Sequence, residues 1–208
     1  MKSKEILDQV AAEVSNCTRC ILHHSRKNAV PGEGPENATM MFIGEGPGFY
    51  ENEQGRPFVG AAGKFLEELL AGIGMKRADV FICNVVKCRP PENRDPLPEE
   101  LAACSEYLER QIQAINPQVI VTLGRYSMAR FLPYARISDV HGKAVKVQDR
   151  LIVAMYHPAA ALHQRSLKPA IEADFARLPE LIARANKVQE AANPEPEPKQ
   201  EPKQLSLF

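Results

Sequence analysis

Hydrophobic residues recur along this chain with two spacings, one typical of amphipathic helices and one typical of buried strands. Residues 4–15 place Ile6, Leu7, Val10 and Val14 on one helical face. Comparable spacing predicts further helices from about residue 60 and over 98–115, 125–132 and 169–186. Short apolar runs predict strands over 39–43, 80–86 and 119–123, followed by a strand pair over 143–147 and 151–155.

The predicted strands and helices alternate, and several of the strands are apolar throughout. This pattern is typical of a mostly parallel sheet with helices on both faces, so we expect an α/β fold with three α/β/α layers. In such sheets, ligands bind at the loops that follow the carboxyl ends of the strands. Three such loops hold distinctive residues, over 44–58, 84–94 and 156–165.

The C-terminal residues differ in composition from the rest of the chain. Residues 189–203 are dominated by Pro and Glu and have no apolar periodicity, which predicts a disordered linker. Residues 1–188 therefore form the predicted folded domain, and residues 204–208 form a separate apolar cluster at the terminus.

Composition and charge narrow the classes of function. Hydrophobic residues make up 44% of the chain, no apolar run is long enough to span a membrane, and the first residues do not resemble a signal peptide. We therefore expect a cytoplasmic protein with reduced thiols. The formal net charge is zero, and removing the four Glu and two Lys of residues 189–208 leaves only +2. Any nucleic acid must bind to a local patch rather than through bulk charge.

Four features of these loops suggest a binding site, although each has an ordinary structural explanation. The stretch Gly44-Glu-Gly-Pro-Gly48 can be a tight turn, and it lacks the spacing of a phosphate-binding loop. Phe58 can face a planar ligand or join the core. Asn84, in an apolar strand, can bond a neighbouring loop or read the edge of a pyrimidine. His157 can be structural, or Pro158 can hold its imidazole rigidly at a site.

The spacing of the cysteines suggests a metal centre. Cys17 and Cys20 form a CxxC pair, whereas Cys88 and Cys104 lie far along the chain. The spacing matches neither the paired knuckles of structural zinc nor the compact run of a bacterial ferredoxin, but it is compatible with four thiolates around one cluster. Cys83 lies within a strand and is expected to be a core residue. Unrelated buried thiols are the alternative.

Taken together, these motifs resemble those of family 4 uracil-DNA glycosylases. The similarity covers roughly residues 5–185 and rests on four stretches in the right order. They are GEGPG with the following Glu51, GRPFVG at 55–60, the stretch from Asn84 to Arg94, and Tyr156-His-Pro-Ala159. The resemblance implies a base excision repair enzyme that flips uracil out of single- or double-stranded DNA and hydrolyses its N-glycosidic bond. Asn52 departs from the family, in which many members have an acidic residue there.

The resemblance also implies roles for individual residues. The uracil would be contacted by Gly44, Glu45, Gly46, Phe58 and Asn84, with the ring stacked on Phe58 and its edge read by Asn84. His157 would donate a hydrogen bond to uracil O2 as charge builds on the leaving base. Glu51 and Asn93 would position the attacking water, and the carboxylate would also stabilise a cationic sugar.

Residues outside the pocket would hold the DNA and a cofactor. Leu162 would fill the space left by the flipped base, while Arg94 and Arg165 would contact phosphates. The resemblance assigns a structural [4Fe-4S] cluster to Cys17, Cys20, Cys88 and Cys104.

The last five residues resemble the pentapeptide by which bacterial proteins bind their sliding clamp. Its contacts would be Gln204, Leu205, Leu207 and Phe208, and the preceding linker would give it reach. We therefore expect uracil-containing DNA and a bacterial sliding clamp as partners, and a monomer that works in the cytoplasm, at the nucleoid.

Other classes of function are compatible with parts of the sequence. A relative could bind uracil or damaged DNA without cleaving it, although the presence of both Glu51 and His157 speaks against this. A clamp-tethered adaptor could keep only the cluster and the tail, and a zinc-bound nucleotide hydrolase is a weaker alternative. Cleavage of a uracil-containing oligonucleotide by the pure protein would distinguish an enzyme from the first two.

Overall fold

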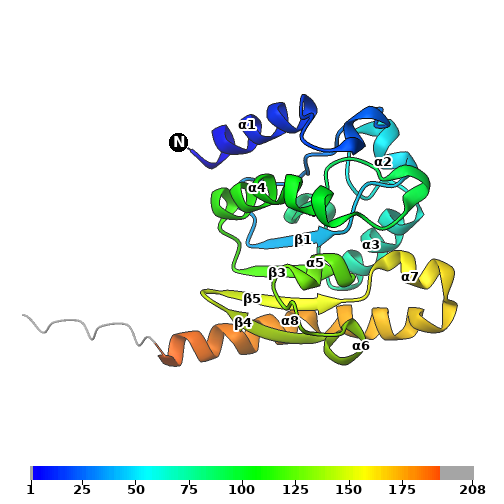
Figure 1. Ribbon diagram of the computed structural model, residues 1–208. Helices are drawn as coiled ribbons and strands as arrows, with labels where there is room; N and C mark the ends of the chain where they lie inside the picture. The colour runs from blue at the N-terminus through cyan, green and yellow to red at the C-terminus, as the bar shows by residue number, and fades with distance from the viewer. Residues whose placement is uncertain (1, 193–208) are drawn as a thin grey trace, which may run out of the picture.

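A five-stranded sheet forms the centre of the protein. The computed structural model describes residues 2–192, and their side chains as far as residue 183. The strands are β1 (Met40–Gly44), β2 (Phe81–Asn84), β3 (Val119–Leu123), β4 (Lys143–Val147) and β5 (Arg150–Met155), in the order β2-β1-β3-β5-β4 (Figure 1). β1 pairs in parallel with β2 and β3, β3 pairs in parallel with β5, and β4 is antiparallel to β5. The prediction of a mostly parallel sheet is confirmed.

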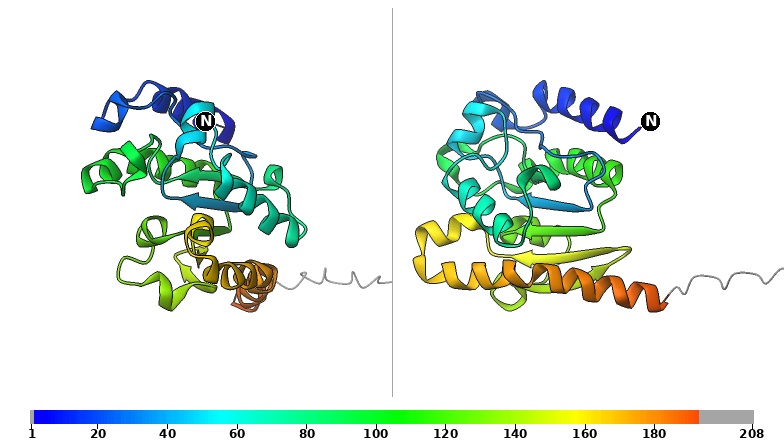
Figure 2. Two further views of the ribbon diagram at one scale, coloured as in Figure 1. Left: turned by 90° about the vertical axis from the view of Figure 1, so that its right-hand side faces the viewer. Right: turned by 180° about the vertical axis from the view of Figure 1, so that it is seen from behind.

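Helices cover both faces of this sheet, as the turned views in Figure 2 show. One face packs on α3 (Ala61–Gly72) and α8 (Lys168–Ala192), and the other on α4 (Pro98–Ile115) and α5 (Arg125–Ala129). Side chains of β1 alternate between the two faces of the sheet. Met40 and Phe42 join the core on the side of α3 and α8, whereas Met41 and Ile43 join the core on the side of α4. Helix α1 (Ser3–Ser15) packs on the outside of α4 through Val10, Val14 and Tyr107.

Two of the distinctive loops contain short helices that the sequence patterns did not indicate. Helix α2 (Phe49–Gln54) lies within 44–58, and α7 (Pro158–His163) lies within 156–165. Both begin with local caps, since Glu51 accepts a hydrogen bond from the Gly48 N–H and His157 accepts one from the Ala159 N–H. The remaining elements are α6 (Ile137–Val140), η1 (Ile21–His24), η2 (Arg77–Asp79), η3 (Pro91–Asn93) and η4 (Arg165–Leu167).

The last helix extends beyond the expected end of the folded domain. Helix α8 reaches Ala192, so residues 189–192, which were predicted to be linker, are helical. The rest of the predicted linker, and the predicted clamp contacts Gln204, Leu205, Leu207 and Phe208, lie outside the described residues.

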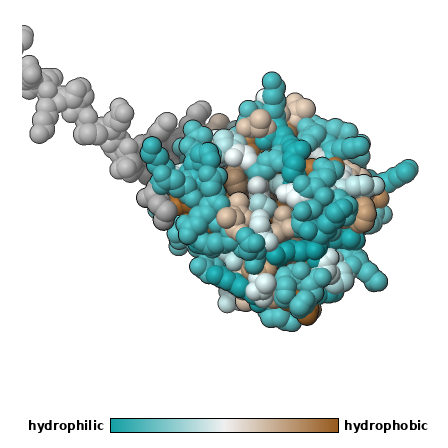
Figure 3. All heavy atoms as spheres, turned by 90° about the horizontal axis from the view of Figure 1, so that it is seen from above, coloured by the Kyte–Doolittle hydropathy of each residue, from teal (hydrophilic) through white to brown (hydrophobic). Residues whose placement is uncertain are grey.

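The face of the molecule shown in Figure 3 is mostly hydrophilic. Seen from above, hydrophobic residues are exposed in small, separate groups (Figure 3). In the described part of the chain, no helix combines the length and the apolar character that crossing a membrane requires. Strand β1 points toward the edge of the molecule where α2 and α7 lie (Figure 1), and β2 and β5 run in the same direction as β1. The three distinctive loops follow these three strands and therefore meet there.

Candidate active site

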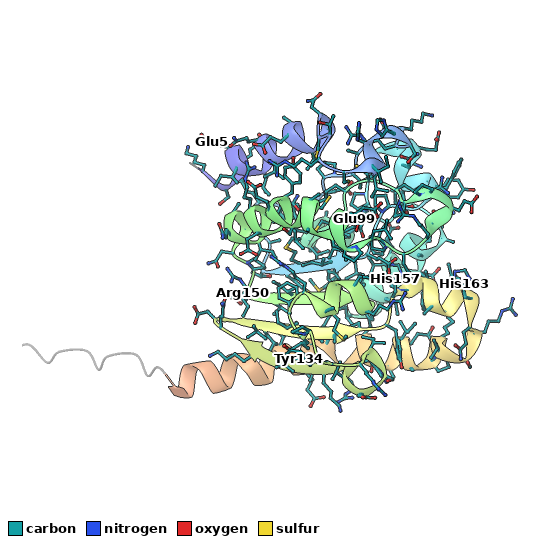
Figure 4. The ribbon with its side chains drawn as sticks, viewed as in Figure 1. Glu5, Glu99, Tyr134, Arg150, His157 and His163 are labelled. Carbon is teal, nitrogen blue, oxygen red and sulfur yellow. The ribbon has the colours of Figure 1, made fainter. Side chains whose placement is uncertain are left out.

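A cavity of about 440 Å³ opens at the carboxyl ends of the parallel strands. It brings together residues from all three distinctive loops, including Glu45, Gly46, Glu51, Phe58, Asn84, Asn93, Arg94 and His157. Gly44 lies directly behind the cavity, against Phe58 and Asn84. Leu162 and Arg165 lie outside the lining, on the exposed surface of α7 and η4. In Figure 4, His157 lies at this end of the sheet and His163 lies farther out along α7.

Asn84 and Phe58 form the inner part of the cavity. Strand pairing sets Asn84 directly beside Gly44, where a Cβ would lie 2.6 Å from Phe58 Cζ and would collide with Asn84 Oδ1. Glycine at position 44 is therefore required for the two side chains to approach the backbone closely. Asn84 is only 1% exposed, and its Oδ1 has no hydrogen-bond partner within the described residues. A buried acceptor without a partner costs free energy unless a ligand supplies a donor.

Phe58 is held in an unusual backbone conformation by residues that the sequence did not point to. Its φ angle is 51°, in the left-handed region that non-glycine residues rarely adopt. Arg77 stabilises this turn, donating to the carbonyl of Phe58 at 2.8 Å and to that of Pro57. Glu33 in turn binds Arg77 and Arg56, and these guanidinium groups hold the pKa of its carboxyl down at about 2.

The Glu51 carboxylate is fixed by three main-chain donors. Its Oε1 accepts from the N–H groups of Val59 at 2.8 Å and Gly60 at 2.9 Å, and its Oε2 accepts from that of Gly48 at 3.1 Å. A carboxylate can accept about four hydrogen bonds. Glu51 therefore keeps capacity for one more donor, such as a water molecule at the cavity, while its position is set by the backbone.

His157 is held as a neutral hydrogen-bond donor. Its ring stacks against that of Phe58, with centroids 5.5 Å apart and an interplanar angle of 24°. Burial lowers the pKa of His157 to about 4, and the nearby Glu51 carboxylate offsets part of this effect. Because Nδ1 accepts a hydrogen bond from the Ala159 N–H at 3.1 Å, the single proton of the neutral ring lies on Nε2.

The loop after β2 supplies the remaining polar groups. Asn93 has a φ angle of 56°, and its Oδ1 accepts from Arg89 Nε at 2.8 Å. Arg94, for which a phosphate contact is expected, forms a bidentate ion pair with Glu100, whose side chain is fully buried. This pair anchors the loop to α4, so in this structure the guanidinium of Arg94 is occupied within the protein. Burial, and secondarily Asp95, raise the pKa of Glu45 to about 6.

Comparison with known proteins identifies the family. The model of the uracil DNA glycosylase superfamily matches residues 31–178. This chain belongs to that superfamily. A Type-4 uracil-DNA glycosylase of Archaeoglobus fulgidus is 47% identical over 190 residues, which cover 86% of this chain and 95% of the relative. One from Thermotoga maritima is 46% identical over 166 residues, covering 78% and 86%. These relatives confirm the prediction of a DNA repair glycosylase, which hydrolyses an N-glycosyl bond.

A more distant branch of the superfamily is also similar. A Type-5 uracil-DNA glycosylase of Pyrobaculum aerophilum is 32% identical over 148 residues, which cover 62% of this chain and 65% of the relative. The higher identity to Type-4 proteins agrees with the motifs that suggested family 4.

The four cysteines outside the strands of this glycosylase are neighbours in space. Cys88 interacts electrostatically with Cys17 and Cys20, and Cys104 interacts with Cys88 and Cys20, whereas Cys83 is enclosed in the core beside β1. All five thiols are free. No group of three or more His, Cys, Asp or Glu side chains in the described residues is placed to hold a metal ion as it stands. Four irons separate their ligand sulfurs more than a single ion does, so a more open set of thiols still fits a cluster.

Hydrogen-bond donors surround these sulfurs, as thiolate ligands require. Arg26 donates to Cys88 Sγ at 3.3 Å and to the carbonyl of Cys17 at 2.7 Å, which ties two of the cysteine-bearing segments together. The backbone N–H of Arg19 lies 3.5 Å from Cys17 Sγ, and backbone donors at Leu22 and Lys87 reach Cys20 and Cys104. Burial raises the pKa of the Cys104 thiol to about 11, so a thiolate there needs a cationic partner.

A buried lysine connects the cysteine region of the glycosylase to its pocket. Lys87 is 1% exposed, and its Nζ donates to the carbonyl of Asn84 at 2.9 Å and to Gln111 Oε1 at 2.6 Å. In the sequence, Lys87 lies between the pocket residue Asn84 and the cysteine Cys88.

The sequence patterns did not single out Lys87, Arg77, Glu33 or Arg26. Of these four residues, only Lys87 could have been found from the sequence, because a basic residue inside an apolar stretch indicates a buried charge with specific partners.

Proposed function

We propose that the cavity of this glycosylase binds a flipped uracil with its ring on Phe58 and its edge against Asn84. The buried, unpartnered Asn84 Oδ1 is the observation that carries this proposal. It can accept the N3–H of uracil while the amide N–H₂ group donates to O4. Cytosine presents the opposite pattern at these two positions, so a fixed amide would leave its own polar atoms unpaired and reject it.

Hydrolysis of the N-glycosidic bond would then use His157 and Glu51, which are already held in position. The Nε2–H of neutral His157 would donate to uracil O2 as negative charge develops on the leaving base, a contribution of ~3–4 kcal/mol for one such donor. The Glu51 carboxylate would stabilise positive charge on the sugar and, with Asn93, orient the attacking water. Because Glu51 is held by main-chain N–H groups, it needs no reorganisation during the reaction.

The DNA itself would be held around the mouth of the cavity. Leu162 is 50% exposed on α7 and would fill the space that the base leaves. Arg165 is exposed and would contact a phosphate, whereas Arg94 would have to exchange Glu100 for a phosphate to do so. We propose that Arg94 chiefly positions the loop that carries Asn93.

The substitution Asn84→Asp tests this assignment of the pocket. Replacing the donor to O4 with an acceptor is expected to slow uracil excision about 100-fold and to weaken discrimination against cytosine. Excision is measured on matched oligonucleotides with uracil or cytosine, followed by alkali to cut the abasic sites. Asn52→Asp is the matched control, since its Oδ1 still accepts from the Lys27 N–H and the side chain lies outside the cavity. Unchanged rates and selectivity for Asn84→Asp would show that the pocket is assigned wrongly.

We further propose that Cys17, Cys20, Cys88 and Cys104 hold a [4Fe-4S] cluster with a structural role. The proximity of the four thiols and the donors around them support this assignment. When bound, the cluster would tie the segment after α1 to the loop after β2 and to α4. Hydrolysis of an N-glycosidic bond transfers no electron, so no step of the reaction requires the cluster.

The C-terminal peptide is proposed to bind a bacterial sliding clamp. Its support is the sequence Gln204-Leu-Ser-Leu-Phe208, which follows a Pro- and Glu-rich stretch. Such peptides bind through a few anchoring side chains. Tethering would raise the local concentration of the glycosylase on newly replicated DNA. A monomeric state and a cytoplasmic, nucleoid-associated location belong to the same proposal.

A further inference from the structure

Two exposed aromatic side chains stand at the mouth of the uracil cavity. Phe49 and Tyr50 are the first two residues of α2, and the residues on either side of them, Gly48 and Glu51, both line the cavity. Tyr50 also lies over the start of α3, where a Cβ on Gly60 would be 3.4 Å from Tyr50 Cδ2. The pair is therefore continuous with the pocket but is not part of its lining.

Both rings are largely open to solvent. Phe49 is 52% and Tyr50 is 59% exposed, although aromatic side chains ordinarily bury most of their area. The two rings meet edge to face, with centroids 5.4 Å apart and an interplanar angle of 85°. This contact favours one orientation of each ring relative to the other.

Arg89 completes this surface. Its guanidinium lies over the Phe49 ring, 5.3 Å from the centroid, and its Nε donates to Asn93 Oδ1 in the cavity. Within the part of the chain that the structure describes, the two terminal nitrogens of Arg89 make no hydrogen bond. A planar cation with free N–H groups can stack beside a base and also bind a phosphate.

Uracil flipping creates a ligand for such a surface. When one base leaves the stack, its neighbour loses a stacking partner, and in a single strand no complementary base holds it. Aromatic side chains stack on any base, because every base has a π face. On the other side of the cavity, the exposed Leu162 of α7 is aliphatic and presents no such ring.

We propose that Phe49 and Tyr50, with Arg89, form a stacking site for the base adjacent to the uracil on the α2 side. The site would favour single-stranded uracil DNA, in which that base is free to stack. The inference rests on the proposed binding of uracil in the cavity, and it adds a second contact that does not read the identity of the base.

The test measures binding of single-stranded oligonucleotides that contain a hydrolysis-resistant 2′-fluoro uracil nucleotide. In one set all bases are present, and in two others the nucleotide on one side or the other of the uracil is replaced by a baseless tetrahydrofuran residue. With the wild-type protein, removing the base on one of the two sides should weaken binding about tenfold. In the double variant Phe49→Ala/Tyr50→Ala, the same removal should change the affinity less than about twofold.

Two controls make the result decisive. Tyr134→Ala removes an aromatic side chain that is 99% exposed and lies well away from His157 in Figure 4, so it should retain the full dependence on the neighbouring base. An oligonucleotide with cytosine in place of uracil reports on the pocket itself, because equal binding of cytosine and uracil would overturn the pocket assignment instead. If removing the neighbouring base weakened binding equally in the wild type and the double variant, the proposed stacking site would be overturned. An affinity loss in the double variant that is just as large on the baseless oligonucleotides would overturn it too.

Discussion

The surroundings of His157 determine how excision should depend on pH. Burial places the pKa of its imidazole at about 4, and Nδ1 is occupied as an acceptor, so the donor form is the neutral ring. We expect kcat to be independent of this group from neutral pH down to about 5, and to fall as the pH drops through about 4. If the imidazolium were the active form, the rate would instead rise over the same interval.

Single-turnover rates on a uracil oligonucleotide, measured from about pH 3.5 to about pH 8, would reveal this dependence. The variant Glu45→Gln is the control, since Glu45 has a pKa raised to about 6 and also lines the cavity. Removing that carboxyl should abolish any inflection near about pH 6 and leave the one from His157. An inflection near the ordinary histidine value in both proteins would contradict the assignment.

The same shift affects folding stability with a definite sign. The unfolded chain protonates His157 near pH 6.5, whereas the folded protein leaves it neutral until about pH 4. The unfolded state thus binds more protons in this interval, and the contribution of His157 lowers the free energy of unfolding as the pH falls from about 6.5 to about 4. Above pH 6.5 the group is neutral in both states and contributes nothing to the pH dependence.

The residues that line the pocket could be predicted from the sequence, but the residues that hold the pocket in shape could not. Phe58, Asn84 and His157 follow strands or tight turns, and the loops after parallel strands meet at one edge, so their convergence could be inferred. Arg77 and Glu33 act by binding carbonyl groups and one another. Many arginines in the sequence could bind a carbonyl group or a carboxylate in this way. Only the three-dimensional structure shows that Arg77 does so.

At the scale of elements, the turn before α3 should depend on Arg77. Arg77→Met would leave the Phe58 and Pro57 carbonyls without their donor and release the left-handed conformation of Phe58. We expect a loss of ~2 kcal/mol in the free energy of unfolding and a fall of about 10–100-fold in kcat/KM, because the stacking ring moves. Denaturant unfolding and excision kinetics measure the two effects. Arg130→Met is the control, since Arg130 pairs at the surface with Glu109; equal losses in both variants would refute a special role for Arg77.

The cysteine-bearing segments should depend on iron. Purified protein is expected to be brown and to contain about four irons per chain, and Cys88→Ala should lose both the colour and much of the stability. Cys83→Ala removes a buried thiol of the core and should keep the iron, although it leaves a small cavity. Iron analysis and visible absorption distinguish the two variants. A colourless wild-type protein with one zinc ion would refute the cluster.

The long helices and the strands were predicted from the sequence, whereas the short helices α2, α6 and α7 were not. Helices α1 and α4 bury apolar residues at helical spacing, so their existence followed from the sequence. Helix α2 is six residues long and is stabilised by the bonds that Glu51 makes with residues before and after it. Such a helix depends on contacts across a turn that no local pattern records.

For the whole molecule, the tail and the folded domain should work independently. A chain ending at Lys203 is expected to excise uracil from free oligonucleotides at the normal rate and to lose binding to a bacterial sliding clamp. The full-length protein should bind with a dissociation constant on the order of 1 μM, because the peptide must be ordered on binding. Titration calorimetry measures both proteins, with Gln204→Ala expected to weaken binding and Ser206→Ala to preserve it. Equal clamp binding by the full and shortened chains would exclude this role for the tail.

Main-chain N–H groups hold Glu51, and the Arg77 side chain holds Phe58 through main-chain carbonyl groups, so neither residue depends on the side chain at position 84. A protein engineer could therefore change the base that is recognised by varying position 84, while the stacking ring and the carboxylate stay in place. The positions to leave alone are Arg77, which holds the turn at Phe58, and Gly44 and Gly63, where a Cβ would overlap Asn84 or Phe58. The pocket thus divides into a scaffold that tolerates no added atoms and one replaceable reading residue, which makes it a suitable starting point for directed evolution toward other pyrimidines.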